Sequence, residues 1–454
     1  MKKPRTVGEL RRSGYKPSTV KEEMRRNLVR RLRAKEEIFP GIVGYDETVI
    51  PQIMNALLSG QDMILLGERG QAKSRLARSL VNLLDDELPI VAGSELNDDP
   101  FKPVSKFARE QVEAHGDEAE IEWIPRDQRY GEKLATPDIT IADLIGEVDP
   151  IRVAEGRYLS DELTIHYGLI PRTNRGIFAI NELPDLAERI QVGLFNLMEE
   201  RDIQIRGYRI RLPVDVYIVA SANPEDYTNR GRIITPLKDR YGSQIRTHYP
   251  KTSELEMKIM EHERTVLGNG SPRVFVPQFM KEIIAELTAL ARKSSDINQR
   301  SGVSVRISIA NYENIVSNAV RRAVLIGEEQ AVPRVSDLPA IVPSTAGKIE
   351  LESVEEGREE HIINQLLQRA VLNTFNRYFG GGRPFEEIVA QFEAGVTAET
   401  SDMKPTLDYV KLLKKVPAFE AAFKELSIED VPPAKASVIE FVLEGLHLNR
   451  RLNK

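Results

Sequence analysis

The stretch from Met63 to Ser74 decides the fold, because the apolar run Met63-Ile-Leu-Leu66 leads directly into Gly67-Glu-Arg-Gly-Gln-Ala-Lys73-Ser74. The apolar run is typical of a buried strand, and residues 75–84 have the pattern of a helix. A glycine-bearing loop that ends in Lys-Ser between a strand and a helix is the pattern of a phosphate-binding loop. Backbone N–H groups of such a loop bind phosphate oxygens, the lysine neutralises the β- and γ-phosphates, and the serine hydroxyl ligates Mg²⁺. We therefore expect ATP and Mg²⁺ at this loop.

One position of the loop departs from the usual pattern, because Ala72 stands where glycine is standard. Alanine is the smallest alternative, but it still needs a tolerable backbone angle there. Without a nucleotide, the same residues would be an ordinary strand–turn–helix with a surface lysine. The loop residues that we expect to contact the nucleotide are Gly67, Glu68, Arg69, Gly70, Gln71, Ala72, Lys73, Ser74 and Arg75.

A second apolar run, Gly176-Ile-Phe-Ala-Ile180, ends in Asn181-Glu182. ATPases with a phosphate-binding loop place an acidic pair here, the first carboxylate for the Mg²⁺ shell and the second to polarise the attacking water. Glu182 keeps the second role. Asn181 keeps a hydrogen-bonding oxygen but loses the charge, so we expect a weakened Mg²⁺ shell made by Ser74 and Asn181, which Asn181→Asp would strengthen. A helix cap is the structural alternative for this pair.

The distribution of apolar runs predicts an α/β region followed by helices. Short runs at 63–66, 89–92, 177–180, 214–220 and 244–249 are separated mostly by helical stretches, which favours a parallel sheet with crossover helices. We place a basic N-terminal helical arm at 1–37, an α/β nucleotide-binding domain at 38–250, an all-α lid at 251–350 and a C-terminal helical segment at 351–454. In the last segment, the helix at 361–379 should stop at Gly380.

The composition excludes several classes of protein. The 454 residues are 41% hydrophobic and 29% charged, as in ordinary globular proteins. No apolar stretch approaches the roughly 18 residues of a membrane span, and no apolar segment follows the basic start, so we expect neither membrane insertion nor a secretory signal. The chain has no cysteine, which excludes disulfides and thiol catalysis and favours a cytoplasmic location.

Charge is distributed unevenly along the chain. Residues 1–35 contain 13 Lys/Arg and 3 Asp/Glu, a balance of +10 in a chain whose net charge is −6. Thr19 and Glu22 fit a capping box, and Val20, Met24, Leu28 and Leu32 form one apolar stripe of the helix that follows. The arm is either a helix docked on the acidic remainder of the chain or a contact for nucleic acid or an acidic partner.

Further segments resemble, in order, motifs of the AAA+ ATPases, and in particular the group that includes the MoxR proteins and the small ATPase subunit of magnesium chelatase. The resemblance covers about residues 36–345. The segments that carry it are Gly41-Ile-Val-Gly44-Tyr-Asp-Glu47, an insert-like stretch at 138–175, Phe195-Asn-Leu-Met-Glu-Glu200, a hairpin-like stretch at 202–211, Ser221-Ala-Asn223-Pro224, Leu237-Lys-Asp-Arg240-Tyr241 and Val303-Ser-Val-Arg306.

The resemblance implies a role for several of these residues. Ile42 and Val43 would touch adenine, and Asn223 would be the first sensor, which helps position the attacking water. Arg240 would be an arginine finger offered to ATP on the neighbouring subunit, and Arg306 would be the second sensor. From the residues alone, Ser221–Pro224 is equally an Asn-Pro turn, and Arg240 equally a surface ion pair with Asp239.

For the whole chain, the resemblance implies a P-loop AAA+ fold and an ATPase that works as a ring, expected to be a hexamer, on a protein partner or client. In this group the partner often carries a von Willebrand A domain. Two alternatives stay open. One is an AAA+ ATPase that acts on nucleic acid or regulates transcription, which would use the basic arm. The other is a weakly hydrolysing, nucleotide-dependent scaffold, for which Ala72 and Asn181 are the reasons.

Overall fold

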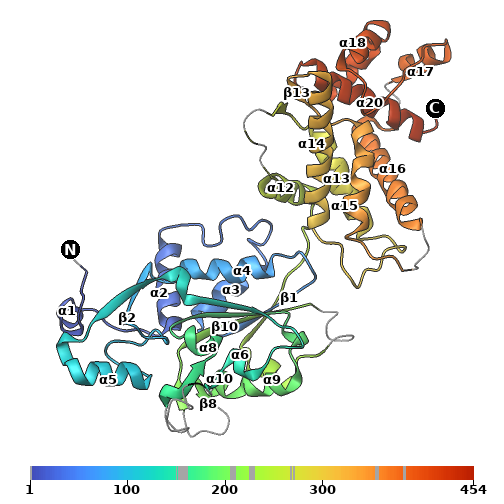
Figure 1. Cartoon of the computed structure of the whole chain (residues 1–454). Coiled ribbons are helices and arrows are strands. Elements are labelled where there is room, and N and C mark those ends of the chain that lie inside the picture. Colours follow the sequence, from blue (N-terminus) through green and yellow to red (C-terminus); the bar gives the residue numbers. More distant parts are fainter. Residues whose placement is uncertain are drawn as a thin grey trace. The chain divides into compact units, whose positions relative to one another are not determined.

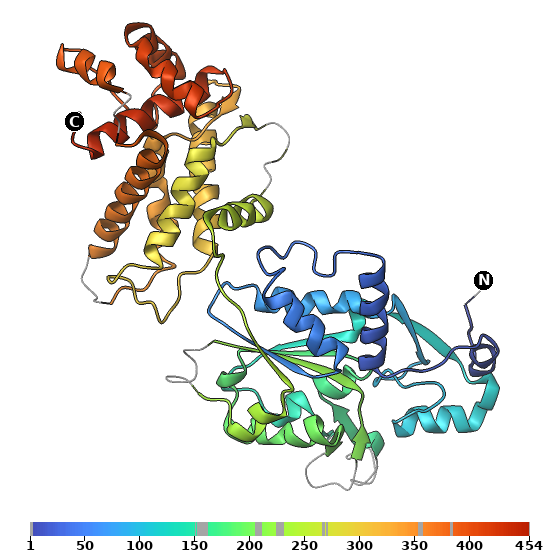
Figure 2. The same ribbon diagram turned by 180° about the vertical axis from the view of Figure 1, so that it is seen from behind.

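The computed structural model describes residues 3–149, 151, 162–204, 211–223, 231–265, 268, 271–352, 357–381 and 385–453. The chain divides into two compact units, Met1–His248 and Tyr249–Lys454. The first unit has an α/β architecture and the second is mainly helical (Figure 1 and Figure 2). No helix within the described ranges is both long and apolar enough to cross a membrane.

A five-stranded sheet forms the centre of the first unit, and each pair of neighbouring strands runs parallel. Its order is β11 (Ser243–Arg246), β1 (Met63–Leu66), β10 (Val216–Ala222), β7 (Gly176–Asn181) and β4 (Tyr130–Leu134). Alternate residues of β7 enter two different cores, Ile177 and Ala179 one, Phe178 and Ile180 the other. Both faces of the sheet are therefore buried, which explains why the central strands are continuous apolar runs.

Helices cover the two faces. The core on one face includes residues of α2 (Val20–Arg33), α3 (Val49–Leu58) and α4 (Lys73–Ser79). The core on the other face includes residues of α6 (Ile141–Leu144), α8 (Leu169–Arg172), α9 (Glu188–Gly193), α10 (Phe195–Glu199) and α11 (Thr235–Arg240). This arrangement is the P-loop AAA+ fold with crossover helices that the sequence predicted.

One predicted strand does not belong to the central sheet. The run at 89–92 lies in β2 (Glu87–Val91), which pairs antiparallel with β3 (Ile121–Pro125) in a separate two-stranded sheet. The edge of the central sheet is instead β4, whose sequence Tyr-Gly-Glu-Lys-Leu has no apolar run. An edge strand needs fewer apolar residues than a central one, and for that reason β4 was missed.

Three smaller antiparallel pairs and the remaining elements complete the first unit. The strands of two of these pairs are β5 (Gly146–Val148) with β6 (Ile165–Tyr167), and β8 (Asp202–Gln204) with β9 (Arg211–Pro213). The third pair is β2 with β3. The β8–β9 pair confirms the hairpin pattern at 202–211, although its turn lies outside the described residues. The remaining helices are α1 (Val7–Arg12) and α5 (Lys106–His115).

The basic arm packs into the first unit. Thr19 and Glu22 form the predicted capping box at the start of α2. Val20, Met24 and Leu28 are buried as predicted, whereas Leu32 is 42% exposed, because α2 ends one residue later at Arg33.

A buried ion pair ties this arm to the sheet. Glu23 of α2 accepts two hydrogen bonds from the Arg129 guanidinium, at 2.8 and 2.6 Å, and both residues are almost fully buried. Arg129 immediately precedes β4 and also donates to the backbone carbonyl of Arg175. The arm is therefore part of the folded unit and fits the prediction of a docked helix.

The second unit is built around one helical core. Phe279 of α13 stacks on Phe441 of α20 with ring centroids 4.4 Å apart, and Phe375 of α16 meets Phe441 edge-on. A Cβ on Gly445 would lie 2.1 Å from the Phe375 ring, so α16 and α20 pack closely. The residues after 351 therefore share a core with residues 251–350. Gly380 caps α16 in the left-handed conformation, as predicted.

The elements of the second unit are α12 (Ser253–Glu263), β12 (Arg273–Val274), α13 (Gln278–Ala291), α14 (Arg306–Ile326), β13 (Gln330–Ala331), α15 (Val342–Ala346), α16 (Arg358–Phe379), α17 (Glu386–Glu393), α18 (Thr406–Lys415), α19 (Glu420–Glu425) and α20 (Pro432–Leu448).

Candidate functional site

The predicted phosphate-binding loop connects β1 to α4, as its sequence pattern requires. Gly70 and Ala72 both adopt left-handed backbone conformations, with φ of +75° and +56°. A Cβ at Gly67 would lie only 1.9 Å from the Thr247 hydroxyl oxygen, so a side chain here would displace that hydroxyl. Ala72 thus has a left-handed backbone conformation, which glycine would adopt without strain.

Lys73 is held inside the loop. Lys73 is only 7% exposed, so it is not the surface lysine expected of an ordinary strand–turn–helix. Its ammonium donates to the carbonyl oxygens of Gly67 and Glu68, the latter at 2.9 Å, and to Oδ1 of Asn223 at 2.6 Å. The cation is thus fixed at the carboxyl end of β1, where phosphate oxygens would meet it.

Asn223 connects this cation to a carboxylate. While its Oδ1 accepts from Lys73, its Nδ2 donates to Oε2 of Glu182 at 2.9 Å. Asn223 follows β10 and Glu182 follows β7, and these two strands are neighbours in the sheet. Glu182 has φ of +56°, a strained conformation for a residue with a side chain, and such strain is common at functional sites.

Ser74 and Asn181 also lie together. The Ser74 hydroxyl donates to Oδ1 of Asn181 at 3.4 Å, and the Ser221 hydroxyl donates to the same oxygen at 3.2 Å. The Nδ2 of Asn181 donates to Oε1 of Glu132 at 2.5 Å. Glu132 lies on β4 and was not among the residues singled out from the sequence.

Glu132 is ionised in this environment. Burial opposes its ionisation, but hydrogen bonds and the charge of Arg78 outweigh burial and lower the pKa of the carboxyl. Arg78 donates to both carboxylate oxygens, at 2.7 and 3.0 Å. The site therefore contains a negative charge beside Asn181, although Asn181 itself is neutral.

The segment predicted to touch adenine packs beside the loop. Ile42 is buried in the core that contains Leu76 of α4, and Val43 follows it half-buried. The Tyr45 hydroxyl lies 3.0 Å from the carbonyl oxygen of Gln71 and 2.8 Å from that of His248. Burial raises the pKa of Tyr45 to about 12, so its hydroxyl stays a donor.

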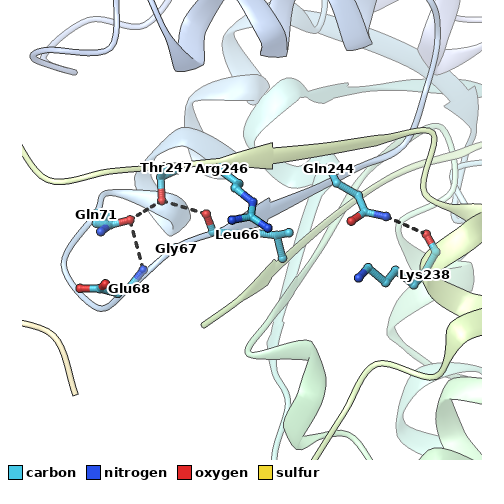
Figure 3. Close-up of a pocket in the computed structure, with 8 residues that line it drawn as sticks. All are labelled: Leu66, Gly67, Glu68, Gln71, Lys238, Gln244, Arg246 and Thr247. Atoms are coloured by element: carbon cyan, nitrogen blue, oxygen red, sulfur yellow. Dashed lines mark hydrogen bonds between the residues drawn. The ribbon is translucent and has the colours of Figure 1, made fainter. Parts of the chain in front are cut away.

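A pocket of about 600 Å³ lies next to the loop (Figure 3). In Figure 3 the Gln71 side chain turns back on the loop, where Oε1 accepts from the Glu68 N–H at 3.1 Å and from the Thr247 hydroxyl at 2.7 Å. The pocket has the size of a small-molecule site. Its lining residues are Leu66, Gly67, Glu68, Gln71, Lys238, Gln244, Arg246 and Thr247. A molecule bound there would therefore touch the nucleotide loop directly.

The two predicted arginines have other contacts within their own units. Arg240, at the end of α11, forms an ion pair with Glu199 rather than with Asp239, and its guanidinium lies 4.6 Å from the centre of the Phe195 ring. Arg306 begins α14 in the second unit, where its backbone N–H donates to the Ser304 hydroxyl at 3.1 Å. Their roles at a nucleotide stay predictions.

The residues present fit a magnesium nucleotide. The site provides a buried cation, the hydroxyl of Ser74, the amide oxygen of Asn181 and the carboxylate of Glu182, and oxygen ligands are those that Mg²⁺ prefers. Lys73 would hold the phosphates and Ser74 the metal, with Asn181 in its outer shell. This fold and this arrangement are typical of the class of nucleotide-binding proteins that have a phosphate-binding loop.

Comparison with known proteins places the chain near one group of that class. It is 25% identical over 370 residues to the chloroplastic magnesium-chelatase subunit ChlI of Oryza sativa subsp. japonica, covering 75% of this chain and 83% of that protein. It is 25% identical over 350 residues to magnesium-chelatase subunit ChlI of Nephroselmis olivacea, covering 71% of this chain and 92% of that protein. The chain is thus related to the ChlI subunits of magnesium chelatase. No family model matches it.

Among solved structures, the chain resembles one from a complex between subunits BchI and BchD of magnesium chelatase, based on single-particle cryo-EM. The sequence identity is 19%, the TM-score is 0.36, and the match covers 71% of this chain and 98% of that chain. With a TM-score at this level, the likeness carries no argument about function.

Proposed function

We propose that the protein is a Mg²⁺-dependent ATPase that converts ATP and water to ADP and phosphate and works as a ring on a protein partner. The observation that carries this proposal is the hydrogen-bonded series Lys73–Asn223–Glu182. It joins a phosphate-binding cation to a carboxylate that can accept a proton from water. Relatedness to magnesium-chelatase ChlI subunits supports the same class of protein.

Each residue of this series, and the neighbouring Ser74 and Asn181, has a definite task in the proposed reaction. Lys73 binds and neutralises phosphate oxygens, and Ser74 and Asn181 hold the metal shell. Glu182 accepts the proton of the attacking water, while Asn223 orients the Glu182 carboxylate through its 2.9 Å hydrogen bond. A bound Mg²⁺ ion would neutralise charge on the phosphates.

The ring is proposed because it would give Arg240 a role at the nucleotide of a neighbouring subunit. In the single chain its guanidinium contacts Glu199, the Pro236 carbonyl and the Phe195 ring. In the proposed ring, this arginine would lie at a subunit edge and face the γ-phosphate of the next subunit, as the resemblance to AAA+ proteins implies. A hexamer of the MoxR type would then be needed for full activity, and Arg306 would be the second sensor.

The partner is proposed to be a protein, and a von Willebrand A domain is the specific candidate. The resemblance to the MoxR and magnesium-chelatase group, in which the partner often carries such a domain, is the support for this candidate. The exposed arginines of α2 keep a nucleic-acid partner as the alternative.

The test is binding and turnover of ATP by the purified full chain. Wild type should bind Mg·ATP in isothermal titration and release phosphate, and Lys73→Ala should bind roughly 10- to 100-fold more weakly, because a charged hydrogen-bonding partner is lost. Absence of ATP binding to wild type would contradict the proposal. Binding without any turnover, also in the assembled ring, would favour the scaffold.

A further inference from the structure

The carboxylate that is missing from Asn181 is present on the neighbouring strand. Oε1 of Glu132 accepts from Nδ2 of Asn181 at 2.5 Å. We propose that Glu132 is a positioning residue of the magnesium site: it orients the Asn181 amide and provides the local negative charge that Asn181 lacks. This inference rests on the proposed function, because it concerns the Mg²⁺ that accompanies ATP.

The orientation follows from hydrogen-bond chemistry. An ionised carboxylate only accepts hydrogen bonds, so the group of Asn181 that faces Glu132 must be its NH₂. The carbonyl oxygen of Asn181 then faces the opposite way, toward the hydroxyls of Ser74 and Ser221 at 3.4 and 3.2 Å. Glu132 therefore selects the amide orientation in which an oxygen, and not an N–H, faces the metal-binding serine.

The sheet register explains why Glu132 can do this. In the parallel pair of β4 and β7, Leu134 lies opposite Asn181 and Glu132 lies opposite Ala179. Residues two apart on a strand share a face, so Glu132 and Asn181 lie on the same face of the sheet. Ala179 also enters the core to which α4 contributes, so this is the face that α4 covers.

Arg78 of α4 completes a closed arrangement. It lies one helical turn after Ser74 and binds both oxygens of Glu132, at 2.7 and 3.0 Å. The Glu132 side chain is 20% exposed, whereas that of Arg78 is 65% exposed. Helix α4 thus supplies a metal ligand and, one turn later, the cation that orients the carboxylate behind Asn181.

The arrangement changes the effect expected of a single substitution. On the sequence alone, Asn181→Asp restores a charge and strengthens the Mg²⁺ shell. In the structure, that change replaces a donor with an oxygen 2.5 Å from Oε1 of Glu132, so two carboxylates would face each other without a proton. Exchanging both residues, as Glu132→Gln with Asn181→Asp, keeps one charge and one hydrogen bond.

The experiment measures metal binding with Mn²⁺ as the probe. Free Mn²⁺ is measured by EPR in the presence of the full-length protein and a non-hydrolysable ATP analogue. Glu132→Ala should weaken Mn²⁺ binding by about 10- to 100-fold, the usual effect of removing an outer-shell partner. Binding of the analogue in EDTA should stay as in wild type, because the loop and Lys73 are intact.

The paired exchange separates this role from a purely structural one. Glu132→Gln/Asn181→Asp should bind Mn²⁺ within about 3-fold of wild type, and Asn181→Asp alone should bind more weakly than the double variant. Glu113→Ala, a substitution at an exposed position of α5, serves as the matched control and should leave the binding of Mn²⁺ and of the analogue unchanged.

Three outcomes would contradict the inference. Unchanged Mn²⁺ affinity in Glu132→Ala is the first. A double variant no better than Asn181→Asp is the second, and it decides the question if Glu132→Ala fails to fold. If wild type binds no analogue even in EDTA, the proposed function itself fails and this inference falls with it. Normal analogue binding with unchanged Mn²⁺ affinity would overturn only the role of Glu132.

Discussion

The side-chain N–H of Asn223 donates a hydrogen bond to the Glu182 carboxylate at 2.9 Å. The side-chain oxygen of the same residue accepts a hydrogen bond from the Lys73 ammonium. Asn223 is 150 positions from Lys73 and 41 positions from Glu182 in the sequence. The three side chains stand at the carboxyl ends of β1, β10 and β7, which are adjacent in the sheet. The positions of the phosphate-binding cation and of the proton acceptor are therefore coupled through one amide.

Asn223→Ala should lower the rate of ATP hydrolysis by about 100-fold, because Glu182 loses the donor that orients its carboxylate. Affinity for ATP should fall much less, since Lys73 still donates to the carbonyls of Gly67 and Glu68. Single-turnover phosphate release and isothermal titration on the same preparation measure the two effects. An equal loss of binding and turnover would show that Asn223 acts on Lys73 alone.

Arg240→Ala mixed with Glu182→Gln should recover part of the ATPase activity that each variant lacks. Mixed rings contain interfaces where an intact Glu182 meets an intact Arg240. Loss of an arginine finger lowers turnover by roughly 10³-fold or more in well-studied nucleotide hydrolases, so recovery is easily measured. Activity is followed over a range of mixing ratios, with sizing to show that mixed rings form.

Glu199→Ala is the control for this experiment, because Glu199 is the carboxylate that pairs with Arg240 in the single chain. If Arg240 serves only that surface pair, Glu199→Ala should lose as much activity as Arg240→Ala. If it acts across the interface, Glu199→Ala should keep most of the activity. No recovery at any ratio, with mixed rings present, would reject the finger.

Ala72→Gly should stabilise the first unit by about 1 kcal/mol, since the left-handed φ of +56° is strained for alanine and open to glycine. Ala114→Gly, at an exposed position of α5, is the matched control and should destabilise by about 0.5–1 kcal/mol. Trp123 is the single tryptophan and lies on β3, so its fluorescence during urea unfolding reports the first unit. If the two substitutions changed the free energy of unfolding equally, the backbone at Ala72 would not be strained.

Wild type should gain stability over Glu440→Gln as the pH falls from 7.5 toward 4.5. Burial raises the pKa of Glu440 above its ordinary value of 4.5, against the hydrogen bonds from Tyr409 and the Ser336 N–H. The folded chain therefore binds this proton more tightly than the unfolded chain, and the stabilisation is lost as pH rises through the folded pKa. Urea unfolding followed by circular dichroism measures the difference; a pH-independent difference would contradict it.

The strands of high apolar content were predictable from the sequence because both faces of the sheet are covered. β1 begins and ends where its apolar run does, at Met63 and Leu66, and the runs at 177–180 and 214–220 overlap β7 and β10. The loop pattern pointed to Lys73, the second apolar run pointed to Glu182, and the resemblance to AAA+ motifs pointed to Asn223. The geometry of these side chains became visible only in the structure.

Glu132 escaped prediction because the edge strand β4 contains Gly131 and the charged residues Glu132 and Lys133 instead of an apolar run. The five residues Tyr-Gly-Glu-Lys-Leu have no apolar/polar alternation either, so the sequence held no strand signal there. Arg306 is a different case. It belongs to the second unit, so its assignment came from resemblance and not from a pattern around the loop.

The buried pair of Glu23 and Arg129 also determines where the chain can be shortened. A fragment that begins after residue 37 would keep the guanidinium of Arg129 but lose its carboxylate, and an uncompensated buried charge destabilises by roughly 3–5 kcal/mol. That is a large part of the 5–15 kcal/mol that stabilises a typical domain. A protease that removes the arm would therefore weaken the nucleotide site from a distance, by destabilising the sheet that carries it.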